Sequence, residues 1–361
     1  MNQRLQHRWL KIKWTICTVE TAVQRCPKIK TIAWLCVLAI AALTVLLPLA
    51  ADAADNASTG TVSIVFENDL FYGTDRGYTN GIMLAWVPPA SPAPDWASRI
   101  ARLIPWFPKE GYVRHGYAVG QSMFTPSDIT VANPPLTDRP YAGWTYGAIG
   151  MGVGTGQQID LVTLTLGVVG PASRAEQTQE FIHHIMDAPQ PQGWDTQLKN
   201  EPGVVVTYMR SWRALVTKTL IGFDLDLTPN MGGALGNVFT YANAGLTIRY
   251  GKHLPMDYGP LRIQPSLPGS AAFEPRSGFE WYLFTGLEGR AVARNIFLDG
   301  NTFSDSRHVE KEPLVGDLQF GFVLNWRTAS LAYTHLLRTR EFKSQSEKHD
   351  NFGAISLTVP Y

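Results

Sequence analysis

Short segments in which apolar and polar residues alternate recur along this 361-residue chain as far as its last residue. In the segment 317–326, one face carries Leu318, Phe320, Phe322, Leu324 and Trp326, and the other carries Gln319, Gly321 and Asn325. Alternation with a period of two is typical of β-strands with one apolar face. In a membrane, strands of ~10 residues satisfy every backbone group only when they close into a barrel. The pattern therefore predicts a transmembrane β-barrel.

The end of the chain and its composition favour the same fold. The last segment, ISLTVPY, alternates up to the aromatic Tyr361, and an aromatic end inside an amphipathic strand resembles the assembly signal of outer-membrane barrels. The chain has 11 Trp, 13 Tyr and 16 Phe, and aromatic residues form the girdles of such barrels. A net charge of +1 gives no reason to expect nucleic acid as a partner. The expected location is the outer membrane.

We expect twelve antiparallel strands, an even number that places both termini of the chain on the periplasmic side. The expected spans are 61–70, 79–87, 113–124, 141–153, 160–170, 203–214, 217–228, 242–251, 279–291, 314–326, 328–338 and 352–361. The outward connections are then 71–78, 125–140, 171–202, 229–241, 292–313 and 339–351. The long inward connections 88–112 and 252–278 are expected as plain loops. The alternative for 88–112 is a short amphipathic helix with Trp96, Ile100, Leu103 and Ile104.

Residues 1–54 differ from the rest and read as a secretory signal peptide, which leaves 55–361 as the mature barrel. Basic residues up to Lys30 precede an apolar run from Ile32 to Ala50, and small residues follow at Ala51–Ala54. The alternative is an anchoring helix, because the apolar run is long enough to span a bilayer. Elsewhere no apolar run approaches ~18 residues. All three cysteines lie in this leader, so the mature chain would have neither disulfides nor a cysteine nucleophile.

Polar residues gather where the first two expected strands meet. Glu67, Asn68 and Asp69 end the first strand, and the stretch from Asp75 to Gly81 opens the second. One short outer connection joins them, so they must lie close in space. Carboxylate and amide oxygens beside glycine-rich backbone are ligands that suit Ca²⁺. The alternative is a loop capped by ordinary Asp and Asn turn chemistry.

The long connection after the fifth strand contains an expected helix from Ala172 to Asp187. Its apolar side carries Phe181, Ile182, Ile185 and Met186, and its polar side carries Glu176, Gln179, His183 and Asp187. A histidine on a rigid helix can act as a general base if substrate reaches it. His184 competes with His183 for this role, and the alternative for both is an inert surface histidine. The following Gly193-Trp194 and Gln197-Leu198 suggest that the connection packs back onto the barrel.

Several of these pieces occur together in one order. E-N-D-x-F begins at Glu67, T-D-R-x-Y-T-N-G ends at Gly81, and D-R-P-Y-A-G-W spans 138–144. G-P, the Gln179 and His183 pair, and G-W-D-x-Q-L at 193–198 follow. This spaced combination resembles the lipid A 3′-O-deacylase family of outer-membrane β-barrels.

The resemblance implies a twelve-stranded barrel, monomeric and with a short helix in an extracellular loop. Such an enzyme is a Ca²⁺-dependent carboxylic ester hydrolase that removes the 3′-linked acyloxyacyl group from lipid A in the outer leaflet. Residue by residue, it implies catalytic roles for Asn68, Asp69, Thr79, Gln179 and His183, with Asp69 also binding the metal. His183 would activate water as general base. The resemblance thereby favours His183 over His184 as the general base.

One part of the family pattern is absent. The loop after the third expected strand, TPSDITVANPPLT, has no pair of basic residues to hold lipid A phosphates. Arg139 and Arg76 are the substitutes that the sequence offers for substrate binding. Two other functions stay open: an outer-membrane phospholipase, whose nucleophile would be Ser122 or Ser127, and a non-catalytic barrel.

Overall fold

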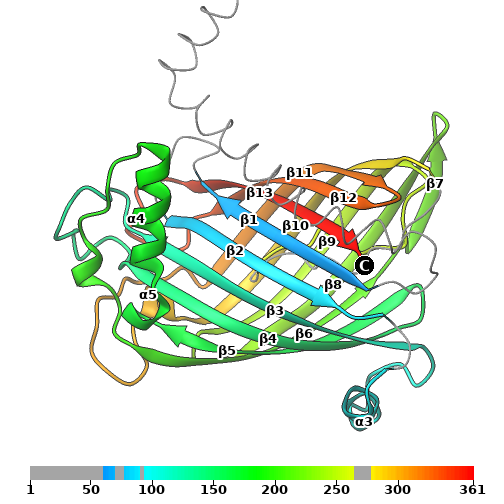
Figure 1. Cartoon of the computed structure of the whole chain (residues 1–361), viewed down its shortest axis with the longest axis horizontal. Helices are drawn as coiled ribbons and strands as arrows, with labels where there is room; N and C mark the ends of the chain where they lie inside the picture. Colours follow the sequence, from blue (N-terminus) through cyan, green and yellow to red (C-terminus); the bar gives the residue numbers. More distant parts are fainter. Residues whose placement is uncertain (1–59, 70–76, 90–92, 264–277) are drawn as a thin grey trace, which may run out of the picture.

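The computed structural model describes residues 60–69, 77–89, 93–263 and 278–361, and these form a closed β-barrel (Figure 1). The strands are β1 Thr61–Asn68, β2 Gly77–Val87, β3 Tyr112–Thr125, β4 Ala142–Gly154, β5 Gln158–Val169, β6 Glu201–Trp212, β7 Val216–Leu220, β8 Phe223–Gly236, β9 Phe239–Lys252, β10 Glu280–Asn295, β11 Leu314–Trp326, β12 Ala329–Thr339 and β13 His349–Pro360. The helices are α3 Asp95–Leu103, α4 Ala175–Met186 and α5 Ile296–Asp299, with short 3₁₀ turns at η2 Pro171–Ser173 and η3 Trp194–Thr196. Within these described ranges, no helix is both long and apolar enough to cross a membrane.

Twelve of the strands form the ring, which confirms the expected fold class. Each strand pairs antiparallel with its neighbour, β1 pairs with β13, and β6 closes the ring by pairing with β8. We call the end where β1 stops at Asn68 the α4 end, and the opposite end the α3 end (Figure 1). Side chains alternate as predicted: Phe320 and Trp326 are exposed on the outside of β11, whereas Gln319 and Asn325 are buried inside.

The expected seventh strand, 217–228, is wrong in its bounds. Its middle is a two-residue turn at Ile221 and Gly222, both with positive φ, between the short β7 and the barrel strand β8. β7 pairs only with β8 and extends beyond the ring. The expected outward connection 229–241 shrinks to residues 237–238, because β8 continues to Gly236. Pro229 is tolerated since the β6–β8 ladder begins only at Asn230, so its missing N–H removes no bond there.

Residues 88–112 are not a plain loop, and the alternative helix is confirmed as α3. Pro94 precedes the helix, Asp95 lies in its first turn and Arg102 in its last, which is the favourable order of charges. The helix lies outside the barrel wall at the end opposite α4 (Figure 1). Ala97 and Phe107 are buried there against Met151 and Val153 of β4.

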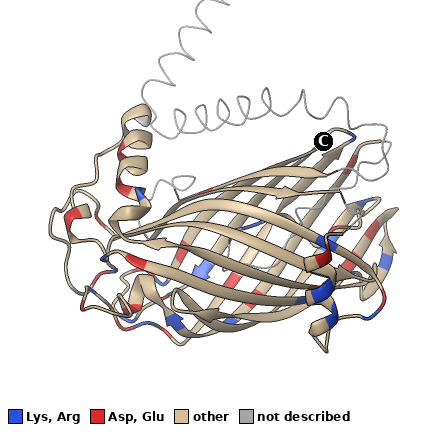
Figure 2. Ribbon diagram, turned by 60° about the horizontal axis from the view of Figure 1, so that its bottom comes forward, with Lys and Arg blue, Asp and Glu red and all other residues tan. Residues whose placement is uncertain are grey.

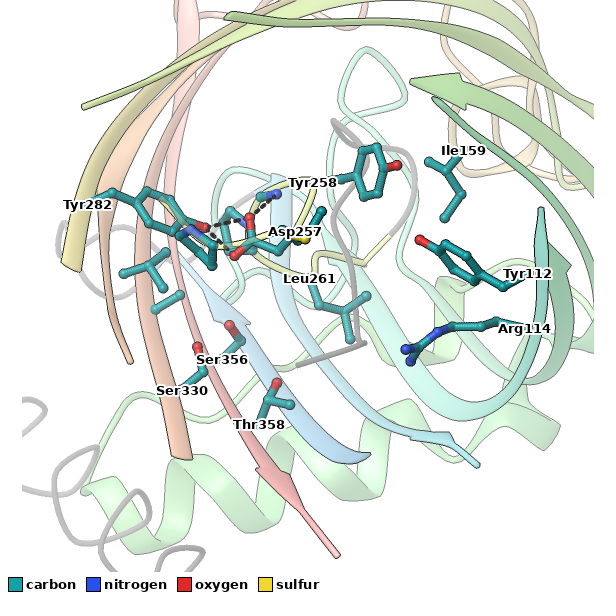
Figure 3. Close-up of a pocket in the computed structure, with 16 residues that line it drawn as sticks. Tyr112, Arg114, Ile159, Asp257, Tyr258, Leu261, Tyr282, Ser330, Ser356 and Thr358 are labelled. Atoms are coloured by element: carbon teal, nitrogen blue, oxygen red, sulfur yellow. Dashed lines mark hydrogen bonds between the residues drawn. The ribbon is translucent and has the colours of Figure 1, made fainter. Parts of the chain in front are cut away.

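The described part of the connection 252–278 is not a plain inward loop either, because it enters the barrel. Arg249 of β9 pairs with Asp226 of β8 and with Asp257 of this connection. Asp257 also accepts a hydrogen bond from Tyr282 (Figure 3). We call residues 254–263 the lumen segment. A buried polar interior can hold irregular backbone that lipid-exposed surface could not, which is why a loop is stable at this depth.

The lumen segment reaches almost to the α4 end. Arg262 contacts Glu67 of β1 at 2.6 Å, and the Ile263 N–H donates to the same carboxylate at 3.2 Å. Ile263 packs in the main apolar core with Tyr78 and Phe124. Glu67 immediately precedes Asn68, so the segment supports the strand end that carries the first polar cluster.

Residues of both charges lie along the barrel strands (Figure 2), and several of them form ion pairs in the interior. Arg290 contacts Glu288 at 2.7 Å and Asp317 at 2.8 Å, and Arg338 contacts Asp317 at 2.9 Å. The cluster continues from Arg338 to Glu341 at 3.5 Å, towards the α4 end. Buried charges are tolerated only when paired, and these groups lie in the lumen as pairs.

Candidate active site

The first two polar clusters meet at the α4 end, as predicted. Asn68 of β1 is directly opposite Asn80 of β2, and the backbone N–H of Asp69 donates to the Thr79 carbonyl at 3.3 Å. Strand alternation places Glu67 inside the barrel with Arg262, and therefore turns Asn68 to the outer face of the wall. All of these polar residues are buried. The cluster is therefore an enclosed polar site on the outside of the wall.

Thr79 occupies an irregularity in β2. The register with β3 shifts between Tyr78 and Asn80, so Thr79 is an extra residue in the ladder. Such bulges re-aim side chains and are common beside functional sites. The Thr79 hydroxyl contacts the Thr125 hydroxyl of β3 at 2.5 Å. The bulge thus fixes Thr79 beside Asp69 instead of leaving it in the regular alternation.

The helix expected at Ala172–Asp187 begins three residues later, because η2 and Arg174 with positive φ precede α4. α4 lies against β3 and β4 through Ala175, which packs with Met123 and Trp194. Gly143 of the D-R-P-Y-A-G-W motif permits this approach. A Cβ there would lie 2.2 Å from both the Ala175 Cβ and the Ser173 hydroxyl. Gly143 of this motif therefore allows α4 to pack closely on β4.

The return segment after α4 packs on the barrel, as its Trp and Leu residues suggested. Trp194 and Leu198 are buried, and the Tyr141 and Trp194 rings lie 4.9 Å apart. The Leu198 N–H donates to the Tyr141 carbonyl at 2.9 Å. Gly193 is needed because a Cβ would meet the Tyr141 ring at 2.5 Å. The D-R-P-Y-A-G-W and G-W-D-x-Q-L motifs therefore pack against each other.

The faces of α4 are reversed relative to an ordinary surface helix. Gln179 and His183 are only 1% and 2% exposed, whereas Phe181 and Ile185 are 65% and 40% exposed. The two buried polar residues are one turn apart on the side facing the barrel. Of the expected polar side, Glu176 is half-buried and Asp187, which ends the helix with positive φ, is exposed.

Hydrogen bonds fix the orientation of both buried side chains. His183 Nδ1 lies 2.6 Å from the Pro189 carbonyl oxygen. A carbonyl can only accept, so Nδ1 carries the proton and Nε2 is the nitrogen able to accept one. Gln179 Oε1 accepts from the Trp194 indole at 2.8 Å. Its Nε2 is buried with no hydrogen-bond partner in the described part of the chain.

Asn80 belongs to the predicted second polar cluster, but the sequence analysis assigned it no role of its own. It is 3% exposed, and neither its amide nitrogen nor its amide oxygen has a hydrogen-bond partner among the described residues. Its neighbour across the β2–β3 ladder is Met123, which packs on Ala175 of α4. Leaving such a group unpaired costs about 1–3 kcal/mol. The signal available in the sequence was its place between Thr79 and Gly81 in the T-N-G motif.

The expected substrate-binding arginines have different outcomes. Arg139 is 2% exposed, contacts Glu341 at 3.3 Å and lies over the Phe124 ring, so its charge is turned into the barrel. Arg76 lies outside the described residues. On α4, burial, together with Glu180 and Asp195, raises the pKa of Glu176. These three carboxylates make this flank of the site acidic, although Arg174 lies directly before the helix.

The donor set at the α4 end suits a hard cation. In the described ranges, no three His, Cys, Asp or Glu side chains gather as a metal cluster. Asp69 nevertheless brings a buried carboxylate, and Asn80 has a buried amide oxygen without a hydrogen-bond partner. Oxygens of these two kinds, with backbone carbonyls, are what Ca²⁺ prefers.

The ring of twelve strands, its apolar outer face and its charged interior define the class of outer-membrane β-barrels. The model of the family "outer membrane protein LpxR" matches residues 35–361. The chain belongs to this family, and its location is the outer membrane. No curated protein matches the chain.

Solved structures of other barrels are similar to the chain in fold. LpxR from Salmonella typhimurium has 17% identity and a TM-score of 0.68, with 83% of this chain and 100% of that chain covered. The β domain of the Bordetella autotransporter BrkA has 8% identity and a TM-score of 0.40, with 85% and 99% covered. The outer-membrane enzyme PagL has 10% identity and a TM-score of 0.26, with 44% and 91% covered. Only the first likeness is strong enough to support the fold.

Proposed function

We propose that this barrel is an esterase that removes the 3′-linked acyloxyacyl group from lipid A in the outer leaflet. One observation carries the proposal: α4 turns Gln179 and His183 towards the polar wall and exposes Phe181 and Ile185. A helix with that arrangement encloses a hydrolytic site while its apolar side meets acyl chains. The α4 end is then the extracellular end of the barrel.

His183 is the general base of the proposed reaction. Its Nδ1 is engaged by Pro189, so Nε2 takes the proton from a water molecule that attacks the ester carbonyl. Gln179 donates through Nε2, since its oxygen is engaged by Trp194. Asn80 adds a second buried amide that can donate to the developing oxyanion. Asn68 and Thr79 orient the groups around them.

Ca²⁺ is proposed as the cofactor, held by Asp69 with oxygen atoms of Asn80 or nearby backbone. When bound, it polarises the ester carbonyl and stabilises negative charge on its oxygen. Asn80 can serve either the cation through its oxygen or the oxyanion through its nitrogen. The Asn80 side chain is buried and has no hydrogen-bond partner among the described residues, so either role is open to it.

The structure gives less support to a serine phospholipase. The Ser127 hydroxyl donates to Asp138, not to a histidine. Ser122 is buried on the face of β3 opposite to Gln121, which donates to the Ser173 carbonyl beneath α4. Neither serine therefore forms a pair with the proposed base.

A purified assay tests the substrate and the metal together. The folded protein is incubated with lipopolysaccharide or with glycerophospholipid, each in Ca²⁺ or in chelator. We expect ester cleavage only of lipopolysaccharide in Ca²⁺, and loss of cleavage in Asp69→Asn. Cleavage of glycerophospholipid alone would point to the phospholipase, and equal cleavage in chelator would remove the metal from the proposal.

A further inference from the structure

Helix α3 has three faces: one packs on the barrel, one is apolar and contacts the barrel through Trp96, and one is charged. Ala97, Ala101 and Ile104 recur at the spacing of one helical face and pack on the wall. Trp96, Ile100 and Leu103 form a second, apolar face, and Asp95, Arg99 and Arg102 form a third, charged one. Leu103 is 80% exposed and Ile100 38%, and Trp106 just beyond the helix is 57% exposed.

The helix is fixed in place on the outside of the wall. Arg210 of β6 donates to the Trp106 carbonyl at 2.5 Å and contacts Asp160 of β5 at 2.7 Å. The Trp106 ring lies 6.0 Å from that of Tyr208. Because strands alternate, Tyr208 and Arg210 are on the outer face, opposite Met209, which lines the interior. α3 therefore lies at a defined height beside the lipid-facing surface.

That height is the level of an aromatic girdle. The Trp96 ring lies 5.8 Å from His115, which lies 5.7 Å from Tyr117, and Tyr117 stacks on Trp86 at 5.3 Å. Trp86 also donates to the Tyr361 hydroxyl. Aromatic girdles mark the boundary between hydrocarbon and headgroups in membrane barrels. The apolar face of α3 is thus continuous with the surface that the barrel presents to lipid.

We propose that α3 and the residues up to Phe107 bind the phospholipid surface of the periplasmic leaflet. Ile100, Leu103 and Trp106 enter the acyl region, and Arg99 and Arg102 pair with lipid phosphates. A helix held against a barrel at girdle height, with an apolar face beside a charged face that carries two arginines, matches the chemistry of that interface. The inference rests on the outer-membrane location and on the orientation that the proposed function gives the barrel, with the α4 end extracellular.

Spin-label accessibility tests the proposal without any measurement of activity. Single cysteines replace Leu103, Arg99, Leu287 or Leu136 in full-length protein whose Cys17, Cys26 and Cys36 are serine, and the folded protein is placed in phosphatidylethanolamine–phosphatidylglycerol vesicles. Leu287, 60% exposed on the outer face of β10, is the lipid control, and Leu136, 73% exposed between β3 and β4, is the water control.

The label at position 103 should favour oxygen over a water-soluble nickel reagent, as at position 287, and the label at 99 should resemble that at 136. If position 103 is as accessible to nickel as position 136, α3 lies in water and the proposal is wrong. If position 103 is inaccessible to both reagents, a second protein surface covers it, and the proposal is equally wrong. Heat-modifiable gel mobility confirms that each variant is folded.

Discussion

At the scale of single residues, the candidate site is defined by polar groups that folding buries without pairing. Asn80 and the Gln179 Nε2 have no hydrogen-bond partner in the described chain, although both lie in an enclosed place. Such groups destabilise a fold, and a functional ligand is a common reason for their presence. The sequence predicted Asn68, Asp69, Thr79, Gln179 and His183 from motif and resemblance, but an unsatisfied amide appears only when its surroundings are known.

Asn80→Ala should reduce the proposed esterase activity by about 10²–10³-fold in kcat, the range for loss of one oxyanion donor. Stability should stay the same or rise, because an unpaired amide is removed. Kinetics on lipopolysaccharide and a thermal unfolding curve measure both effects.

Asn325→Ala is the matched control. Asn325 is also 3% exposed, and neither of its amide atoms has a partner in the part of the chain that the structure describes, but it faces the barrel interior from β11 towards the α3 end. Its replacement should leave kcat unchanged. Equal losses in the two variants would mean that unpaired amides affect the whole barrel and that Asn80 has no place in the site.

At the scale of elements, periodicity found the strands well and the connections poorly. The sequence analysis ended the seventh strand at residue 228, before Pro229, because the proline and glycines of β8 resemble loop residues. It also ran that strand through the turn at Ile221 and Gly222. The 252–278 connection was expected as a loop, since nothing in its sequence shows that Arg262 finds Glu67 from 195 positions away. An ion pair between residues so far apart in sequence depends on the closed barrel, which brings them together, and not on the local sequence pattern.

The apolar face of α4 gives a prediction about substrate. Phe181→Ser with Ile185→Ser should raise KM for lipopolysaccharide in vesicles by about tenfold or more, because full burial of one such side chain stabilises by about 1.5–3 kcal/mol. The value of kcat should change little. Gln177→Ser, also exposed on α4, is the control. An unchanged KM in the double variant would mean that this face does not meet acyl chains.

The lumen segment gives a prediction about stability. Arg262→Met should destabilise the barrel by about 3–5 kcal/mol, the usual result of leaving one member of a buried ion pair unpaired. Glu67→Gln added to Arg262→Met should recover most of this loss, because both charges are then absent. Unfolding in urea measures each variant. If the double variant is no more stable than the single one, the pair is not what anchors the segment.

At the scale of the whole molecule, the barrel is closed at its circumference, and its interior contains ion pairs and irregular backbone. Ion pairs from Glu288 to Glu341 and the lumen segment occupy the interior. The closed twelve-stranded ring was predictable from alternation and the even strand count. What the lumen contains was not, because its contents depend on side chains from distant strands.

The ion pairs and the lumen segment inside the barrel predict that the protein does not conduct ions. In planar bilayers we expect no open-channel steps, whereas a porin reconstituted in the same way should show them. Steady single-channel conductance by the unmodified protein would contradict this prediction and would favour a pore over an enzyme.

The central claim is that His183, on a helix whose polar face is turned to the wall, hydrolyses lipid A. Mass spectrometry of lipid A from cells that express the protein tests it most directly, with His183→Ala and with His184→Ala, the exposed neighbour, as control. We predict loss of the 3′-linked acyloxyacyl group with the wild type and His184→Ala, but not with His183→Ala. Lipid A left intact by the folded wild type in Ca²⁺, or cleaved equally by His183→Ala, would contradict the claim.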